Sequence, residues 1–316
     1  MSAYIIRRLL VAIVVVIGIA IFTFLLLHWL QPSPVYAVLG ARAQPAAVVS
    51  WNLQHGYDRP EISQMFSYLG NLSTLNFGYS YKLDQSVGAL FRENAGRSIY
   101  LTGAALVLSL IIAIPLGIAQ AVKRNSIGDY TATSLNFILY SMPSFFLGLI
   151  LIQIFALDLG VFPPTVSDSI TTTWGAITHP LQMTLPIVTL AAINVASFSR
   201  YMRSSALDNL AQDYIRLARA KGLSERAVLF RHLLRNACLP MITLVGLSIP
   251  SLLAGNLLIE VLFNIQGLGL LFYTALGNQD YNILLAYTVL GGVLTVLGNL
   301  MADVGVTVAD PRIRLG

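Results

Sequence analysis

The side chains of this sequence that could do chemistry are not spaced as an active site requires. Four histidines, His28, His55, His179 and His232, are scattered and lack the spacing of metal ligands. A single cysteine, Cys238, excludes an internal disulfide and a cysteine-rich metal site. No acid–base pair, activated nucleophile or G-x-x-x-x-G-K-[ST] phosphate-binding pattern occurs. We therefore expect no catalytic residue, metal or cofactor in this chain, and no enzymatic activity.

Polar residues inside apolar stretches are the remaining candidates for function. Glu260 ends one such stretch, and acidic residues within a membrane often contact a substrate. Its position at the end of the stretch favours a structural or interfacial role. The candidates for lining a substrate pathway are Asn194, Ser248, Asn256 and Glu260. Asp303 ends the last stretch as a boundary residue, and Gly267-Leu-Gly269 predicts a turn or a partly re-entrant segment.

The composition predicts a membrane protein. Hydrophobic residues make up 56% of the chain and charged residues 10%, whereas a soluble domain carries about 25% charged residues. Six runs of roughly 20 residues contain no charged side chain, which argues against the buried helices of a large soluble protein. They are Leu9–Leu30, Ile99–Val122, Tyr130–Leu157, Leu181–Ser199, Leu239–Ile259 and Tyr281–Ala302. The sequence therefore predicts an all-α polytopic membrane protein with six transmembrane helices.

The basic residues predict the orientation of these helices. With the N-terminus inside, 14 of the 19 Lys and Arg lie in the cytoplasm, eight of them between 200 and 238. The short outer loops 158–180 and 260–280 contain none, and short loops decide the positive-inside rule. Both termini are therefore predicted to be cytoplasmic. The net charge of +5 then reflects topology and requires no nucleic acid.

Three regions follow from this topology. Residues 1–30 are expected to form the N-terminal segment and first transmembrane helix, 31–98 a small external domain, and 99–316 a five-helix core with a cytoplasmic loop at 200–239. The external segment mixes aromatic residues with turn formers, which predicts an ordered domain with short helices. A cleaved signal peptide is the alternative for the N-terminus. The first run, about 22 residues, exceeds the 7–15 apolar residues of such a signal and favours a retained helix.

The segment 200–240 predicts a helix, a glycine turn and a second helix. Apolar residues over 207–218 follow helical spacing opposite a polar face, which is typical of an amphipathic helix. Gly222 is expected to end it in a left-handed conformation. Ser224 can cap the next helix, with Glu225 in the first turn facing the positive end of the helix dipole. This second helix is expected to run to about Asn236.

Three functions fit such a segment. A DNA-binding helix-turn-helix has a similar order, but here it would be fixed between two membrane spans. A helix lying on anionic lipid is a second possibility. The third, a docking elbow for a cytosolic protein, is favoured by the spacing of small residues. Ala218 and Gly222 are four residues apart and would allow a partner to approach the backbone at one spot, with basic residues around them for ion pairs.

The elbow also carries a resemblance to a known family. Ala218-Arg-Ala220-Lys-Gly222, followed by Leu223-Ser224, resembles the EAA loop of ABC importer permeases. The longer stretch from Asp213 to Gly222, continuing to Arg231-His-Leu-Leu-Arg-Asn236, is similar to the dipeptide/oligopeptide/nickel branch of binding-protein-dependent importers. Two positions depart from the general motif: Arg216 replaces its acidic residue, and Arg235 replaces its proline. These departures favour the peptide/nickel branch over the sugar and amino-acid branches.

Further stretches resemble the same family in order and spacing. They are Tyr4-Ile-Ile-Arg-Arg8-Leu-Leu, Asn76-Phe-Gly78-Tyr-Ser80, Glu260 with Phe263 and Gly267-Leu-Gly269, Asp280-Tyr281, and Asp310-Pro-Arg-Ile-Arg314. The long segment 31–98 resembles the first of the family's two permease types. The resemblance implies that the residues coupling to an ATPase are Asp213, Arg216, Ala218, Arg219, Ala220, Lys221, Gly222, Ser224 and Glu225.

The resemblance implies one permease of each type in the bacterial cytoplasmic (inner) membrane, forming a pore together. Two cytosolic ATPase subunits would bind ATP and magnesium, and an external substrate-binding protein would deliver the cargo. Peptides are the expected cargo, with nickel or another small chelate as the alternative inside the family. A secondary transporter or channel is the rival from another class. Such carriers usually place acidic residues or broken helices at mid-membrane, and the six runs contain no ionisable acid at depth.

Overall fold

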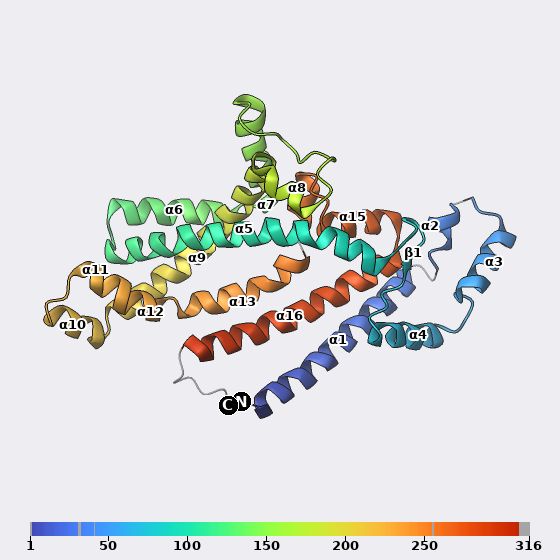
Figure 1. Ribbon diagram of the computed structural model, residues 1–316, viewed down its shortest axis with the longest axis horizontal. Helices are drawn as coiled ribbons and strands as arrows, with labels where there is room; N and C mark the ends of the chain where they lie inside the picture. The colour runs from blue at the N-terminus through green and yellow to red at the C-terminus, as the bar shows by residue number, and fades with distance from the viewer. Residues whose placement is uncertain (1, 31–32, 41, 255, 310–316) are drawn as a thin grey trace.

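The computed structural model describes residues 2–30, 33–40, 42–254 and 256–309, which are almost entirely helical (Figure 1). Four helices are long and apolar enough to cross a membrane. They are α1 (Ser2–Leu30), α5 (Val87–Val122), α9 (Pro180–Leu210) and α16 (Tyr281–Ala309). Two bent helix pairs raise the number to six if each pair counts as one span. The chain is thus an all-α polytopic membrane protein, and the count of six stays a prediction.

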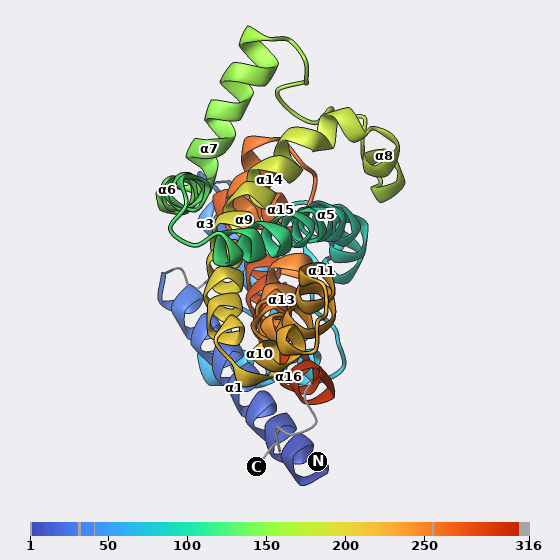
Figure 2. The same ribbon diagram turned by 90° about the vertical axis from the view of Figure 1, so that its left-hand side faces the viewer.

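The run predicted as the third span consists of two helices. α6 (Ile127–Ser141) is followed by α7 (Ser144–Leu151) and the π-helical segment η1 (Ile152–Asp158). The chain bends by 108° between α6 and the stretch Ser144–Asp158. Pro143 lacks an N–H and disfavours helical geometry in the residue before it, so Met142 is extended (φ −78°, ψ 134°). α7 contacts α9 and α14, while η1 extends beyond the other helices (Figure 2).

Two other helix boundaries differ from the predicted spans. α5 begins at Val87 rather than Ile99, because Val87, Leu90 and Phe91 are buried against α15 and α16. The run predicted over Leu239–Ile259 is divided between two helices. These are α13 (Leu239–Ala254) and α14 (Leu257–Leu262). The remaining helices are α8 (Thr173–Thr178), α10 (Asp213–Ala220), α11 (Glu225–Ala227), η2 (Val228–Leu233), α12 (Leu234–Ala237) and α15 (Leu268–Asn278).

The segment between α1 and α5 contains the predicted short helices and a hairpin. The helices are α2 (Val35–Leu39), α3 (Pro45–His55) and α4 (Glu61–Ser73). The strands β1 (Tyr79–Ser80) and β2 (Gln85–Ser86) pair antiparallel, with Tyr79 opposite Ser86. Trp51 is buried, and its ring stacks on His55 at a centroid distance of 4.1 Å. Aromatic side chains therefore pack together in this region.

The long helices lie side by side and give the molecule two distinct ends. α5 packs along α9, and α13 packs along α16. One end carries α10 to α12 and is called the elbow end; the opposite end carries α2 to α4 and is called the hairpin end (Figure 1). Arg8 of α1 pairs with Asp303 of α16 at 2.5 Å, so the first turns of α1 lie beside the last turns of α16. The stretch from Asp310 to Arg314, which carried part of the resemblance, lies outside the described residues.

Candidate functional site

The first helix of the elbow is divided in two. α9 and α10 lie on either side of Gln212, which is extended (φ −75°, ψ 150°). The prediction of one amphipathic helix over 207–218 is therefore wrong. The sequence has no proline or glycine at this break. Instead the hydroxyl of Tyr214 donates a hydrogen bond across it to the side-chain oxygen of Asn209 (2.8 Å), a contact that hydrophobic spacing cannot reveal.

The turn after α10 has the predicted left-handed glycine. Gly222 has φ +76°, and the N–H of Leu223 donates to the carbonyl of Ala218 (3.4 Å) across the turn. A Cβ atom on Gly222 would meet nothing within 4 Å, so this position is open to a partner. Ser224 Oγ accepts a hydrogen bond from the N–H of Ala227 (3.4 Å) and caps the second helix. Both capping predictions are confirmed, and the helical stretch continues through η2 and α12.

The inner face of the elbow is part of the protein core. Ile215 and Ala218 lie three residues apart on one face of α10 and are buried with Val228 and Leu233. The same apolar cluster contains side chains of α5, α9 and α13, so the elbow is packed on the long helices. Ala218 therefore faces the interior. The prediction that it opens the backbone to a partner beside Gly222 is wrong.

The outer face of the elbow carries the other predicted coupling residues. All of them are exposed: Asp213, Arg216, Arg219, Ala220, Lys221, Gly222, Ser224 and Glu225. Arg219 Nε pairs with Glu225 Oε1 across the turn at 2.8 Å, and Arg216 pairs with Asp213 at 3.3 Å. Exposed ion pairs are weak, so these charges can exchange partners when another surface docks. The same segment exposes the apolar side chains of Leu217 (56%), Leu223 (41%) and Phe230 (65%).

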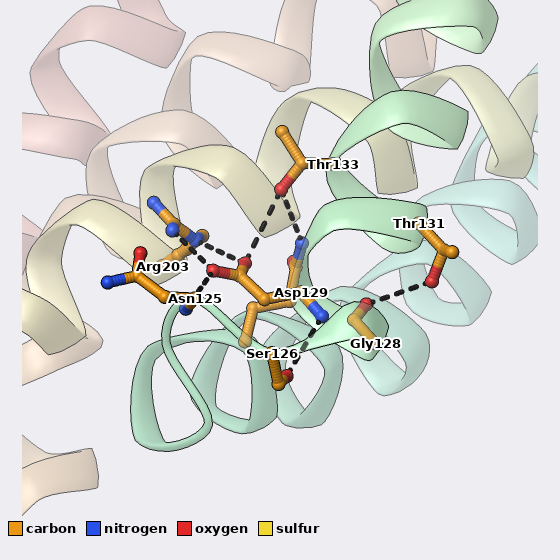
Figure 3. A network of polar contacts seen from close by, with 8 residues as sticks. Asn125, Ser126, Gly128, Asp129, Thr131, Thr133 and Arg203 are labelled. Atoms are coloured by element: carbon orange, nitrogen blue, oxygen red, sulfur yellow. Dashed lines mark hydrogen bonds and ion pairs between the residues drawn. The ribbon is translucent and has the colours of Figure 1, made fainter.

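A partly buried ion pair at the elbow end was not predicted. Arg203 of α9 donates from Nε and Nη2 to the two carboxylate oxygens of Asp129, at 2.8 and 2.7 Å. Asp129 also accepts hydrogen bonds from the N–H of Asn125 (3.0 Å) and the hydroxyl of Thr133 (3.4 Å) (Figure 3). We call Asp129 and Arg203 the latch, because they fasten α6 to the helix that leads into the elbow. The sequence signal is the S-x-x-D capping pattern that starts at Ser126, which predicts a helix start but no distant partner.

Glu260 lies in a closed network at the hairpin end. It is 0% exposed, and it accepts hydrogen bonds from Ser98 Oγ (2.7 Å) and from the backbone N–H of Gly269 (2.7 Å), Leu270 (3.1 Å) and Asn256 (3.3 Å). These donors belong to α5, α15 and the residue before α14. The carboxylate therefore joins three elements, which agrees with the structural role that its position in the sequence favoured.

The other candidates for a substrate pathway lie on α9, on α13 and directly before α14. Asn256 caps α14 by accepting a hydrogen bond from the N–H of Ile259 (3.3 Å). Ser248 donates to the carbonyl of Leu244 in its own helix (2.8 Å), and Asn194 is half-buried on α9. Their place in a pathway stays a prediction. Within the part of the chain that the structure describes, no three histidine, cysteine or acidic side chains gather as a metal site requires.

Two stretches far apart in the sequence meet at the hairpin end. The Ser80 hydroxyl donates to the carboxylate of Asp280, and the Asn282 amide donates to the carbonyl of Tyr79 (2.8 Å). Gly78 is left-handed (φ +83°), and a Cβ atom there would lie 3.1 Å from Asn282 Cγ. Burial raises the pKa of Asp280, and the Ser80 hydrogen bond opposes this shift. The hairpin is thus fastened to the start of α16.

Comparison with known proteins gives the family. Residues 113–315 match the family described as binding-protein-dependent transport system inner membrane component, and residues 1–83 match the N-terminal part of such membrane components. The chain belongs to this family. The oligopeptide transport system permease protein AppB of Bacillus subtilis is 37% identical over 315 residues, which cover 99% of this chain and 100% of that protein. The dipeptide permease DppB of the same organism is 35% identical over 318 residues, covering 100% of this chain and 99% of that protein. The oligopeptide permease OppB of Haemophilus influenzae is 35% identical over 317 residues, with coverages of 99% and 100%.

As a member of this permease family, the chain is a multi-pass protein of the bacterial inner membrane and a transport subunit that works with other components of an ABC importer. The stretches that carried the resemblance meet in the fold. Ser80 contacts Asp280, and Glu260 contacts Gly269. Cβ atoms on Gly267 and Gly269 would lie 2.3 and 2.9 Å from Glu260 Oε2, so the buried carboxylate requires glycine at both positions.

Proposed function

We propose that this permease forms half of a pore that conducts peptides inward, driven by ATP hydrolysis on separate subunits. The observation that carries the proposal is the elbow, whose core side is packed on the long helices while Gly222 lies open on a basic and partly apolar face. Such a face suits docking of another protein, because exposed apolar side chains surrounded by polar ones mark interaction sites. The names of the full-length relatives, which are peptide permeases, support peptide as the cargo.

The proposed assembly contains a second homologous permease, two cytosolic ATPase subunits that bind ATP and magnesium, and an external binding protein. The elbow end faces the cytoplasm in this proposal, because eight Lys and Arg lie between 200 and 238 and basic loops stay inside. The hairpin end then faces the binding protein. Both termini are cytoplasmic, which the Arg8–Asp303 pair supports by holding the ends of α1 and α16 on one side.

Two contacts would pass movement of the elbow to the pore. The buried cluster around Ile215 connects α10 and η2 with α5, α9 and α13. The latch connects α9 with α6. Packed interiors shift between discrete arrangements rather than deforming continuously, so a displaced elbow would carry its helices with it. This is the proposed route from ATP hydrolysis to alternating access.

Nickel or another small chelate is the alternative cargo within the family, and no observation on this chain favours it. The cognate binding protein, purified from its native host, should carry peptides when analysed by native mass spectrometry. A binding protein that carries nickel and no peptide would contradict the peptide assignment and leave the importer mechanism in place.

The substitution Gly222→Leu tests the docking role of the elbow. A left-handed conformation costs a non-glycine residue about 1–2 kcal/mol, which a packed bundle should survive. The added side chain meets nothing inside the chain, so its steric effect falls on a docked partner. We expect the variant to accumulate normally and to pair with its sister permease, while ATP-dependent peptide uptake is lost or ATP hydrolysis becomes uncoupled from uptake.

Gly160→Leu is the matched control. Gly160 is also left-handed (φ +63°) with nothing within 4 Å, but it lies in the loop after η1, away from the elbow. It imposes the same backbone cost without touching the proposed interface, so uptake should be close to wild type. If Gly222→Leu also leaves uptake unimpaired at wild-type protein levels, the elbow lies on lipid, and the proposed coupling is wrong.

A further inference from the structure

A cleft of about 910 Å³ lies at the hairpin end between α5, α8, the segment 264–267 and α15. Its volume is within the range of small-molecule sites. Amides and hydroxyls make up much of its lining, including Asn94, Asn264, Gln266 and Thr274. The charged side chains that line it are Glu93 and Arg97, both on α5. No part of the coupling mechanism uses this cleft.

Arg97 is the unusual group in the lining. It is 4% exposed, its Nε donates to the carbonyl of Gln266, and its Nη2 donates to the side-chain oxygen of Asn94 (2.7 Å). Its Nη1 has no hydrogen-bond acceptor among the described residues, and no acidic side chain among them lies within ion-pair distance of Arg97. A buried guanidinium with an unsatisfied donor is costly, so a native protein that keeps one requires an explanation.

The two acidic residues near Arg97, Glu260 and Glu93, differ in their hydrogen bonds and exposure. Glu260 lies under the floor of the cleft at Gly267, but four hydrogen bonds within the chain already hold its two oxygens. Glu93 is exposed, one helical turn before Arg97, and one of its oxygens accepts from the Gln85 amide (2.7 Å). Residues four apart on a helix usually pair when their charges are opposite. Here no ion pair joins Glu93 to Arg97, although both side chains line the cleft.

The spacing of these two groups matches a short zwitterion. Four residues along a helix advance about 6 Å, and an extended dipeptide spans about 7 Å. We propose that this cleft binds the two termini of a short peptide, with Arg97 taking the carboxylate and Glu93 the ammonium group. The inference rests on the proposed peptide transport and goes beyond it by naming a site. Binding through the two termini alone does not depend on the peptide side chains, which suits an importer of many sequences.

The test measures binding of radiolabelled dialanine to the intact importer complex in nanodiscs, without ATP and without the binding protein. N-acetylated and C-amidated dialanine serve as competitors that each lack one terminal charge. Loss of one charge-assisted hydrogen bond should weaken binding about ten- to hundredfold. In the wild type, both blocked peptides should therefore compete poorly.

The variants assign the termini to the two side chains. Glu93→Gln should bind dialanine as weakly as the wild type binds the acetylated peptide. Acetylation should then weaken binding no further, while amidation still should. Arg97→Gln should show the converse. If Arg97→Gln does not accumulate, Arg97→Lys can replace it. Lysine keeps the positive charge but lacks the paired N–H donors of the guanidinium, so it should weaken carboxylate recognition only in part. Arg92→Gln, on the same helix but outside the cleft, should match the wild type.

The outcomes separate this site from the transport function. Equal competition by free and blocked peptides, absence of dialanine binding, or unchanged selectivity in Glu93→Gln would overturn the site. Each of these results is compatible with ATP-dependent peptide uptake by the same complex in proteoliposomes with its binding protein, in which case peptide transport stands. Absence of peptide uptake in that second assay contradicts the transport function itself.

Discussion

At the scale of single residues, the acidic side chains of this permease differ chiefly in what surrounds them. Glu260 has all of its acceptors occupied inside the fold, whereas Glu93 lies exposed in a cleft. The sequence shows an acid at the end of an apolar run in one case and an acid in a polar stretch in the other. It cannot show that Ser98, 162 positions away, donates to Glu260. Local patterns predicted Gly222 and Ser224 correctly because turns and caps depend on neighbouring residues.

Replacing Glu260 with glutamine separates a structural role from contact with substrate. The amide places an N–H group against backbone donors, and a buried unsatisfied group costs about 1–3 kcal/mol. We expect Glu260→Gln to lower the apparent melting temperature of the purified complex by several degrees, measured by size-exclusion chromatography after heating. Glu61→Gln, on the exposed first turn of α4, should have no effect. Wild-type stability together with lost uptake would instead identify Glu260 as part of the substrate pathway.

At the scale of elements, hydrophobic runs predicted where helices lie but not where they break. The third run contains Pro143 within an apolar sequence, and a run of this kind fits either a bent span or two separate helices. The break before α10 contains no proline or glycine, and hydrophobic spacing cannot reveal the hydrogen bond from Tyr214 to Asn209 that spans it. The latch was missed for a related reason. Asp129 and Arg203 are 74 positions apart and each lies near the edge of an apolar run, where a charge is expected anyway.

The latch predicts a coupling energy between two helices. The Asp129 side chain is 2% exposed and that of Arg203 is 28% exposed. Removing one partner leaves the other charge poorly solvated, at a cost of about 3 kcal/mol for a buried pair and less where water reaches it. We therefore expect Asp129→Ala and Arg203→Ala each to reduce thermal stability, and the double variant to be little worse than either one. Strictly additive losses in this double-mutant cycle would show that the pair does not hold α6 to α9.

At the scale of the whole molecule, the two ends have different compositions. The elbow end holds basic side chains on an open face, and the hairpin end holds aromatic rings, the cleft and the joint between Ser80 and Asp280. The distribution of basic residues along the chain was sufficient to predict this difference between the ends, since basic residues concentrate in the loops on one side of a membrane. The contacts that join distant segments at the hairpin end could not be predicted, because they are made by single hydrogen bonds between turns. The sequence therefore predicts where the basic residues gather better than it predicts the packing.

The topology can be tested by labelling single cysteines in a Cys238→Ala background. Ser63 on α4 and Asp168 before α8 are exposed at positions predicted to lie outside, and Ser224 is exposed on the elbow. Cysteines at the first two positions should react with an impermeant thiol reagent added to intact cells, whereas Ser224→Cys should react only after the membrane is opened. The reaction requires an accessible thiol, so labelling of Ser224→Cys in broken cells is the control for exposure. Labelling from outside at Ser224 would place the elbow away from any cytosolic ATPase and would contradict both the orientation and the coupling proposed for this permease.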